Sequence, residues 1–96
     1  MKQLRELGIS FKKYERLPYP KNLGKKSKLG GDPEWIQEAE KVECPFCHKE
    51  MTFIAQIDSI DYSNEKYNEY IFGDIGMIYI FFCFECLQTK SVFQTF

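Results

Sequence analysis

The four cysteines of this chain stand in two pairs with the same internal spacing, CPFC at 44–47 and CFEC at 83–86. Two intervening residues let the backbone turn so that both sulfurs of a pair point at one ion, and two such turns complete a tetrahedral set of thiolates. Soft thiolate ligands favour zinc over magnesium or calcium. Since the protein fills every coordination position, the sequence predicts one structural Zn²⁺ ion, held by Cys44, Cys47, Cys83 and Cys86.

The residues that follow each pair agree with this interpretation. His48 stands directly after Cys47, where such turns often have Gly in a left-handed conformation, and His tolerates that conformation better than most residues. His48 can also replace a cysteine as a ligand, although four available thiols favour a surface turn position for it. Lys49 and Lys90 follow close behind the two pairs and are expected to ease the negative charge of four thiolates.

Three other uses of the cysteines stay open at this stage. Two disulfides need an oxidising compartment, which nothing in the sequence indicates. A thioredoxin-like redox pair needs a helix after the motif, whereas strands are expected here. An iron–sulfur cluster also takes four cysteines. Zinc remains the preferred interpretation because of the spacing and the setting.

Catalytic residues are harder to find. Asp58, Asp61 and Asp74 are candidates for a converging carboxylate set, but acids at strand ends and in loops are usually solvated. Gly30-Gly31 is too short for a phosphate-binding loop. His48 has no free nucleophile beside it, because all four cysteines are assigned to the metal. We therefore expect no enzyme activity.

Three strands are expected to position the cysteines. Residues 51–58 alternate, with Phe53, Ala55 and Ile57 on one face and Gln56 and Asp58 on the other. Residues 76–84 are apolar on both faces, as in a central strand, and 91–96 are β-branched and aromatic. The polar stretch 59–75 is expected to be a loop. Each cysteine pair leads into a strand that carries a glutamine, which suggests a faint internal repeat.

Ninety-six residues make one domain, and its charge is unevenly distributed. Residues 1–29 carry a net charge of +7 and residues 30–96 carry −8. Pro and Gly rule out a long helix before residue 31, so residues 1–29 are predicted to form a basic extended arm. The arm either lies on its own acidic domain or reaches for an anionic partner. Asp32-Pro33 resembles a helix start, so residues 35–39 form either a helical turn or a loop.

The fold class that follows is mainly β, a small antiparallel sheet with a zinc-ribbon-like four-cysteine site, the basic arm and little helix, with residues 30–96 as the zinc-stabilised domain. The sequence lacks a secretory signal and an apolar run long enough for a membrane span, so a cytoplasmic location is expected.

Aromatic residues between the arm's cations resemble a nucleic-acid-binding composition, and the single Trp35 either anchors an interface or packs on the sheet. The candidate binding residues are Lys12, Lys13, Arg16, Lys25, Lys26, Lys28 and Trp35.

Three segments resemble the YwqG-like family of uncharacterised bacterial proteins, in its zinc-knuckle-bearing form: SKLGGDPEWIQ at 27–37, CPFCHKEMTFIAQID at 44–58 and GDIGMIYIFFCFEC at 73–86. The resemblance implies a β-rich module without an established reaction and offers no catalytic residues. Some members resemble companions of secreted bacterial toxins, which implies an immunity or interaction role. Many relatives are longer, and His48 stands where relatives often have Gly.

Two functions are therefore carried forward. The first is a cytoplasmic, zinc-stabilised module that recognises another protein, and the excess of acid in residues 30–96 favours a basic partner surface. The alternative is a nucleic-acid-binding zinc ribbon that uses the arm, against which the acidic domain would repel phosphates.

Overall fold

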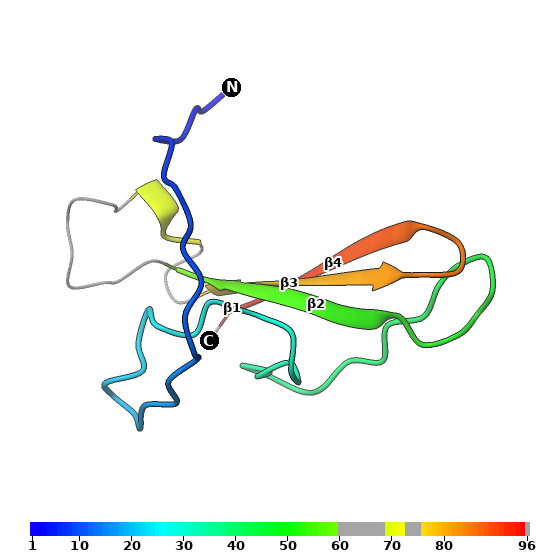
Figure 1. Ribbon diagram of the computed structural model, residues 1–96, viewed down its shortest axis with the longest axis horizontal. Helices are drawn as coiled ribbons and strands as arrows, with labels where there is room; N and C mark the ends of the chain where they lie inside the picture. Colours follow the sequence, from blue (N-terminus) through cyan, green and yellow to red (C-terminus); the bar gives the residue numbers. More distant parts are fainter. Residues whose placement is uncertain (60–68, 73–75, 96) are drawn as a thin grey trace.

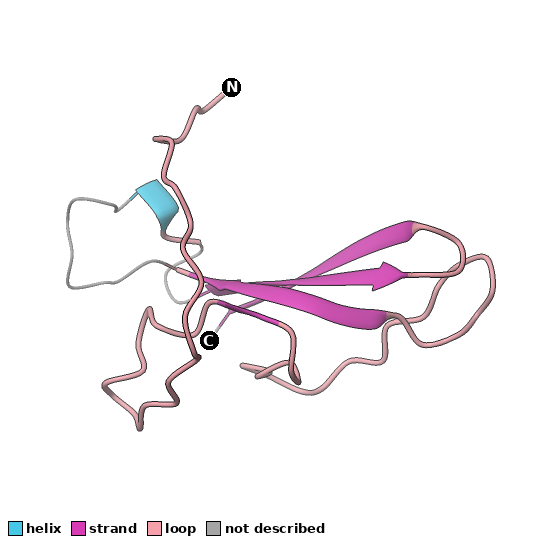
Figure 2. Cartoon of the chain, in the orientation of Figure 1, coloured by secondary structure: helices cyan, strands magenta, loops and turns pink. Residues whose placement is uncertain are grey.

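The fold is a four-stranded antiparallel sheet with the strand order β1-β2-β3-β4 (Figures 1 and 2). It is seen in a computed structural model of the chain, which describes residues 1–59, 69–72 and 76–95. The strands are β1 (Lys28–Leu29), β2 (Thr52–Asp58), β3 (Gly76–Cys83) and β4 (Gln88–Thr95). The predicted mainly β fold is confirmed, and so are the three long strands. β1 comes from the range assigned to the arm, so the arm ends inside the sheet.

The two faces of the sheet differ in what covers them. On the central strand β3, Met77, Tyr79 and Phe81 are buried and point to one face, here called the inner face. The alternate residues of β3 are partly exposed and point to the opposite face, here called the outer face. Because both faces of β3 are apolar, the strand shows the continuous hydrophobic run from which its central position was predicted.

A β-bulge overturns the predicted alternation of β2. The register pairs Phe53 with Phe81 but Ala55 with Ile80, so the extra residue Ile54 shifts the pattern by one. Phe53 therefore shares the inner face with Gln56 and Asp58, while Ala55 and Ile57 lie on the outer face. The prediction that Phe53 and Ala55 point the same way was wrong, because a strict period of two cannot contain an inserted residue.

The loop that precedes the first cysteine pair lies over the inner face and is held there by side chains of the sheet. The Tyr79 hydroxyl donates a hydrogen bond to the Glu34 carbonyl at 2.8 Å and accepts one from the Ile36 N–H at 3.0 Å. The Gln56 side-chain carbonyl accepts a bond from the Glu34 N–H at 3.0 Å. Tyr79 and Gln56 are paired in the register, so two neighbouring strands hold the same short segment.

Gln94 on β4 repeats this arrangement farther along the loop. Its side-chain carbonyl accepts from the Gln37 N–H at 3.0 Å, and its amide donates to the Glu38 carbonyl at 2.9 Å. These contacts satisfy main-chain groups that a helix would otherwise pair internally. Of the two conformations expected after Asp32-Pro33, the loop is the one observed. Gln56 and Gln94, the two members of the faint sequence repeat, thus have the same role.

Trp35 packs on the sheet, one of the two roles that the sequence left open for it. Its ring lies 4.5 Å from that of Tyr79 and 6.0 Å from that of Phe81, measured between centroids. Trp35 and Ile36 cover a buried cluster that extends from the middle of the sheet to the cysteines. The members of this cluster are Val42, Cys44, Met51, Met77, Tyr79, Phe81 and Cys83. The end of the sheet that carries the cysteines and the hydrophobic core are therefore continuous.

No helix among the described residues has the length and apolar character that a membrane crossing requires.

Candidate metal centre

The structure brings the four cysteines together at one end of the sheet. Their sulfur atoms all lie within 4.8 Å of one another, and the Sγ atoms of Cys47 and Cys83 are 3.7 Å apart. A tetrahedron with metal–sulfur bonds of about 2.3 Å has sulfur–sulfur edges of about 3.8 Å. All four thiols are free, so they can all act as ligands. The four cysteines can therefore hold a single metal ion, and the measured edge matches a single tetrahedral centre.

The first pair is shaped by a tight turn, here called the first knuckle (residues 44–48). The His48 N–H donates to the Cys44 carbonyl at 2.9 Å, and the Cys44 N–H donates to the Lys49 carbonyl at 2.9 Å. His48 has a φ of 61°, which confirms the predicted left-handed conformation. Its side chain is exposed, and His48 is not a member of the sulfur cluster.

The second pair forms an equivalent turn, the second knuckle (residues 83–87). The Leu87 N–H donates to the Cys83 carbonyl at 2.8 Å, and Leu87 has a φ of 56°. The Cys86 N–H approaches the Cys83 sulfur at 3.4 Å. Leucine is disfavoured in the left-handed region, so no local signal predicted this turn beyond the spacing of the cysteines. Figure 1 shows the two knuckles side by side at the end of the sheet.

Backbone amides make the Cys44 sulfur receptive to a cation, whereas the pKa of the Cys47 thiol is raised. The N–H of Cys47, with a smaller effect from that of Phe46, lowers the pKa of the Cys44 thiol to about 7. Burial raises the pKa of the Cys86 thiol to about 12. A metal ion must displace the protons from such thiols when it binds, so occupancy of the site is expected to depend on pH.

An ion pair joins the two knuckles outside the sulfur cluster. The Lys49 ammonium lies 2.8 Å from the Glu85 carboxylate, and both side chains are largely exposed. Glu85 is the main cause of the raised pKa of Lys49, and Cys47 and Cys83 contribute less. Lys49 was expected to act on the thiolates, but its direct partner is the glutamate of the opposite knuckle. An exposed ion pair of this kind contributes little to the free energy of unfolding. It does form a direct contact between the two knuckles.

Of the three predicted carboxylates, the structure describes only Asp58, because Asp61 and Asp74 lie outside the described residues. Asp58 is buried at the end of β2, and its carboxylate accepts a hydrogen bond from the Lys26 N–H at 3.2 Å. The Asp58 N–H in turn donates to the Ser27 hydroxyl at 2.8 Å. Burial is the main cause of the raised pKa of this carboxyl. Asp58 thus attaches the arm to the sheet.

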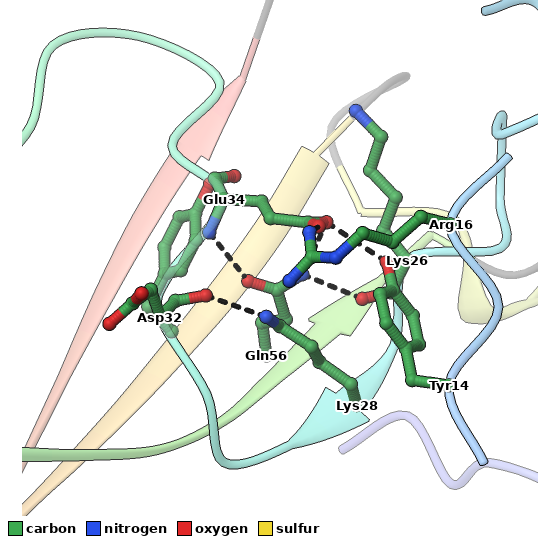
Figure 3. A network of polar contacts seen from close by, with 8 residues as sticks. Tyr14, Arg16, Lys26, Lys28, Asp32, Glu34 and Gln56 are labelled. Atoms are coloured by element: carbon green, nitrogen blue, oxygen red, sulfur yellow. Dashed lines mark hydrogen bonds and ion pairs between the residues drawn. The ribbon is translucent and has the colours of Figure 1, made fainter. Parts of the chain in front are cut away.

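The basic arm lies on its own domain, one of the two arrangements that its charge predicted. Glu34 is the centre of the contact shown in Figure 3: its carboxylate pairs with Arg16 at 2.5 Å and accepts a bond from the Tyr14 hydroxyl at 3.0 Å. Burial and the Glu34 charge raise the pKa of Tyr14 to about 12. Lys28 donates to the Asp32 carbonyl at 2.6 Å. The sequence drew attention to Tyr14 as an aromatic residue of the arm and to Glu34 as part of a possible helix start, but their contact was not predicted, because the two residues lie far apart along the chain.

The candidate binding residues fall into two groups. A pocket of about 160 Å³ between the arm and the loop after Asp32 brings together Arg16, Lys25, Lys26 and Trp35. Lys28 lies beside this group, with its ammonium 5.3 Å from the centre of the Tyr14 ring. Lys12 and Lys13 are instead exposed on the extended part of the arm.

Comparison with known proteins finds one informative similarity. The uncharacterised protein YpfL of Salmonella typhimurium (strain LT2) is 38% identical to the chain over 68 residues. The match covers 71% of the chain but spans about 15% of the length of that relative. No family model matches the chain, and no solved structure matches it. The resemblance to the YwqG-like family therefore stays a prediction.

Proposed function

We propose that the chain is a zinc-stabilised module that binds another protein and works in the cytoplasm, where thiols remain reduced. Four sulfurs within 4.8 Å of one another, of which Cys47 and Cys83 are 3.7 Å apart, support a single ion, and thiolate ligands favour zinc among the common divalent ions. With every position taken by protein, the ion's role is to hold the two knuckles together. The surface of the two knuckles, which the ion would hold in place, is therefore the candidate binding surface.

Three large apolar side chains stand out from the metal end, and this observation carries the proposal. Phe46 is 69% exposed, Phe84 is 65% exposed and Leu87 is 71% exposed. These three residues, here called the knuckle tip, belong to the two turns that the sulfurs bring together. Aromatic residues are enriched in the cores of protein interfaces. A metal-organised apolar tip is therefore suited to anchoring a partner protein, and the acid excess of residues 30–96 favours a partner with a basic rim.

The test is capture of a partner from nuclease-treated native extract, with the metal content measured on the same sample. The double variant Phe46→Ser, Phe84→Ser is expected to keep its zinc and lose the partner. A single Phe11→Ser variant is the matched control, because Phe11 is 81% exposed on the arm and away from the tip. If the double variant captures the same protein in the same amount, the knuckle tip is not the binding surface.

The alternative, nucleic-acid binding by the arm, is favoured by one feature. Lys12 and Lys13 are exposed beside the exposed Phe11, so cations and an aromatic ring are available together. The double variant Lys12→Glu, Lys13→Glu leaves β1 and the Glu34 contacts in place. Under this alternative, RNA or DNA binding falls steeply with salt in the parent chain and is lost in the variant. An immunity-like role is proposed on the YwqG-like resemblance alone.

A further inference from the structure

Each of the four strands contributes at least one apolar residue to the outer face of the sheet. The register places Leu29 beside Ala55, Ala55 beside Ile80, Ile57 beside Ile78, and Ile78 beside Phe93, so all four strands contribute. Phe82 extends the row along β3 toward the second knuckle, where its ring contacts that of Phe84 at 4.9 Å. The apolar members of the outer face are Leu29, Ala55, Ile57, Ile78, Ile80, Phe82 and Phe93.

Among the described residues, several apolar side chains of this face are exposed, whereas the inner face is covered, although the Phe72 carbonyl lies against Gly76 at one end of the outer face. The loop over residues 34–40 and the arm are both anchored to the inner-face side chain of Gln56 (Figure 3), and the loop is also anchored to Tyr79. On the outer face, Leu29 is 64% exposed, Phe93 is 52% exposed and Ile57 is 37% exposed. Domains are normally built of two packed layers around one core, and contiguous exposed apolar patches mark interaction sites. The exposed part of the outer face is a candidate surface of this kind.

The outer face is also free of charge. The polar positions that the register places on it are Thr52, Thr89, Ser91 and Thr95. No ionisable side chain lies among the outer-face positions of the four strands, in a chain of which 28% is charged. The net charge of the whole chain is only −1. Two identical copies of such a face meet without like-charge repulsion, and a near-zero net charge favours association.

We propose that the outer face packs against the outer face of a second copy of the chain, as a two-fold symmetric β-sandwich. A two-fold axis brings the same patch of both copies together, which suits a self-complementary neutral surface. Two sheets that pack face to face lie about 10 Å apart and interdigitate their side chains. The dimer supplies the second layer that a single copy lacks. The dimer contact adjoins the knuckle tip, whose Phe84 touches Phe82, but it is made by the strands and not by the knuckles.

The size of the face sets the strength of the dimer. Three strands about 4.8 Å apart and about 25 Å long present roughly 350 Å² of projected surface. Two copies therefore cover roughly 700 Å² in projection, which is below the size of stable specific interfaces and in the range of weak, transient contacts. We expect a reversible dimer that forms in the micromolar range or above.

Sedimentation equilibrium of the full zinc-loaded chain at rising protein concentration tests the proposal. The apparent mass is expected to double between the low-micromolar and the millimolar range. Added sulfate should strengthen an apolar dimer. Association through a basic arm on the acidic domain of another copy would weaken with salt. A monomer at millimolar concentration, or a dimer that salt dissolves, overturns the proposal.

Two variants place the contact on the outer face. Phe93→Glu and Leu29→Glu each put a carboxylate at an exposed outer-face position, where packing against a second copy would bury it without a partner. Both are expected to stay monomeric at concentrations at which the parent dimerises, while Phe11→Glu, which adds the same charge on the arm, still dimerises. Circular dichroism and zinc content show which variants fold, and if Phe93→Glu does not fold, Leu29→Glu decides. A folded Leu29→Glu variant that dimerises like the parent chain contradicts the proposed interface.

Discussion

Removing a single hydroxyl group tests the way in which the sheet holds its covering loop. Tyr79 is fully buried at the centre of β3, and Tyr79→Phe keeps its ring against Trp35 while deleting the group that bonds to Glu34 and Ile36. The variant leaves one partly buried carbonyl and one partly buried N–H without their partner. Nothing else on the inner face needs to move, so the change isolates the two hydrogen bonds.

The expected loss follows from those two bonds. A typical hydrogen bond contributes about 1 kcal/mol net, and a buried group left unsatisfied costs about 1–3 kcal/mol. The free energy of unfolding should therefore fall by about 2–4 kcal/mol. For a domain of this size, each kcal/mol corresponds to about 4–8 °C in melting temperature. The loss is a large fraction of the stability of a small domain.

Urea unfolding of the zinc-saturated chain measures this change, with circular dichroism and the fluorescence of Trp35 followed together. Zinc must be present at the same excess in every sample, because a ligand that binds only the folded state adds to the apparent stability. Tyr19→Phe is the matched control, because Tyr19 is 76% exposed. A Tyr79→Phe variant that loses less than about 1 kcal/mol, or no more than the control, would refute the reasoning that this hydroxyl fixes the loop.

Three further outcomes are expected. Leu87→Gly should raise the free energy of unfolding by about 0.5–1 kcal/mol in thermal denaturation, because glycine removes the left-handed strain at an exposed position; a destabilised variant would show that Leu87 packs in solution. Gly76→Ala should lower it by about 1–3 kcal/mol or more, because an added Cβ would lie 2.1 Å from the Phe72 carbonyl oxygen and 2.7 Å from the Phe93 ring; an unchanged melting temperature contradicts that crowding. Asp58 has a raised pKa in the fold, so its share of stability falls as pH rises from its usual value of 3.8 through the folded pKa. The stability of Asp58→Asn relative to the parent should therefore increase over that range, and a constant difference across pH counts against buried Asp58 as the cause.

The spacing of the cysteines predicted more than any other feature of the sequence. Each CxxC turn brings its own two sulfurs together, because the geometry of such a turn is local. His48 also indicated the left-handed residue of the first knuckle. Leu87 does the same in the second knuckle without any local signal, since the closed cluster imposes a conformation that leucine does not prefer. The mainly β fold was equally accessible, because the apolar run of β3 requires burial on both faces.

What the sequence could not show depends on contacts between distant residues. The bulge at Ile54 moved Gln56 and Asp58 to the same face as Phe53, where an alternating pattern had placed them on opposite faces. Gln56 and Gln94 were noticed only as a repeat, and their role appears when the loop is folded over them. Glu34 gathers Arg16 and Tyr14 across 18 and 20 residues of chain, a contact that charge imbalance predicts in kind but not by residue.

The metal content of the purified chain tests the central claim most directly. We predict one zinc ion per chain by elemental analysis, with four sulfur neighbours at about 2.3 Å by X-ray absorption. Cys83→Ser should lose the metal and the cooperative melting transition together, because the knuckles and the buried core are continuous. A chain that carries iron, or one that binds no metal and melts identically with and without a strong chelator, would contradict the account.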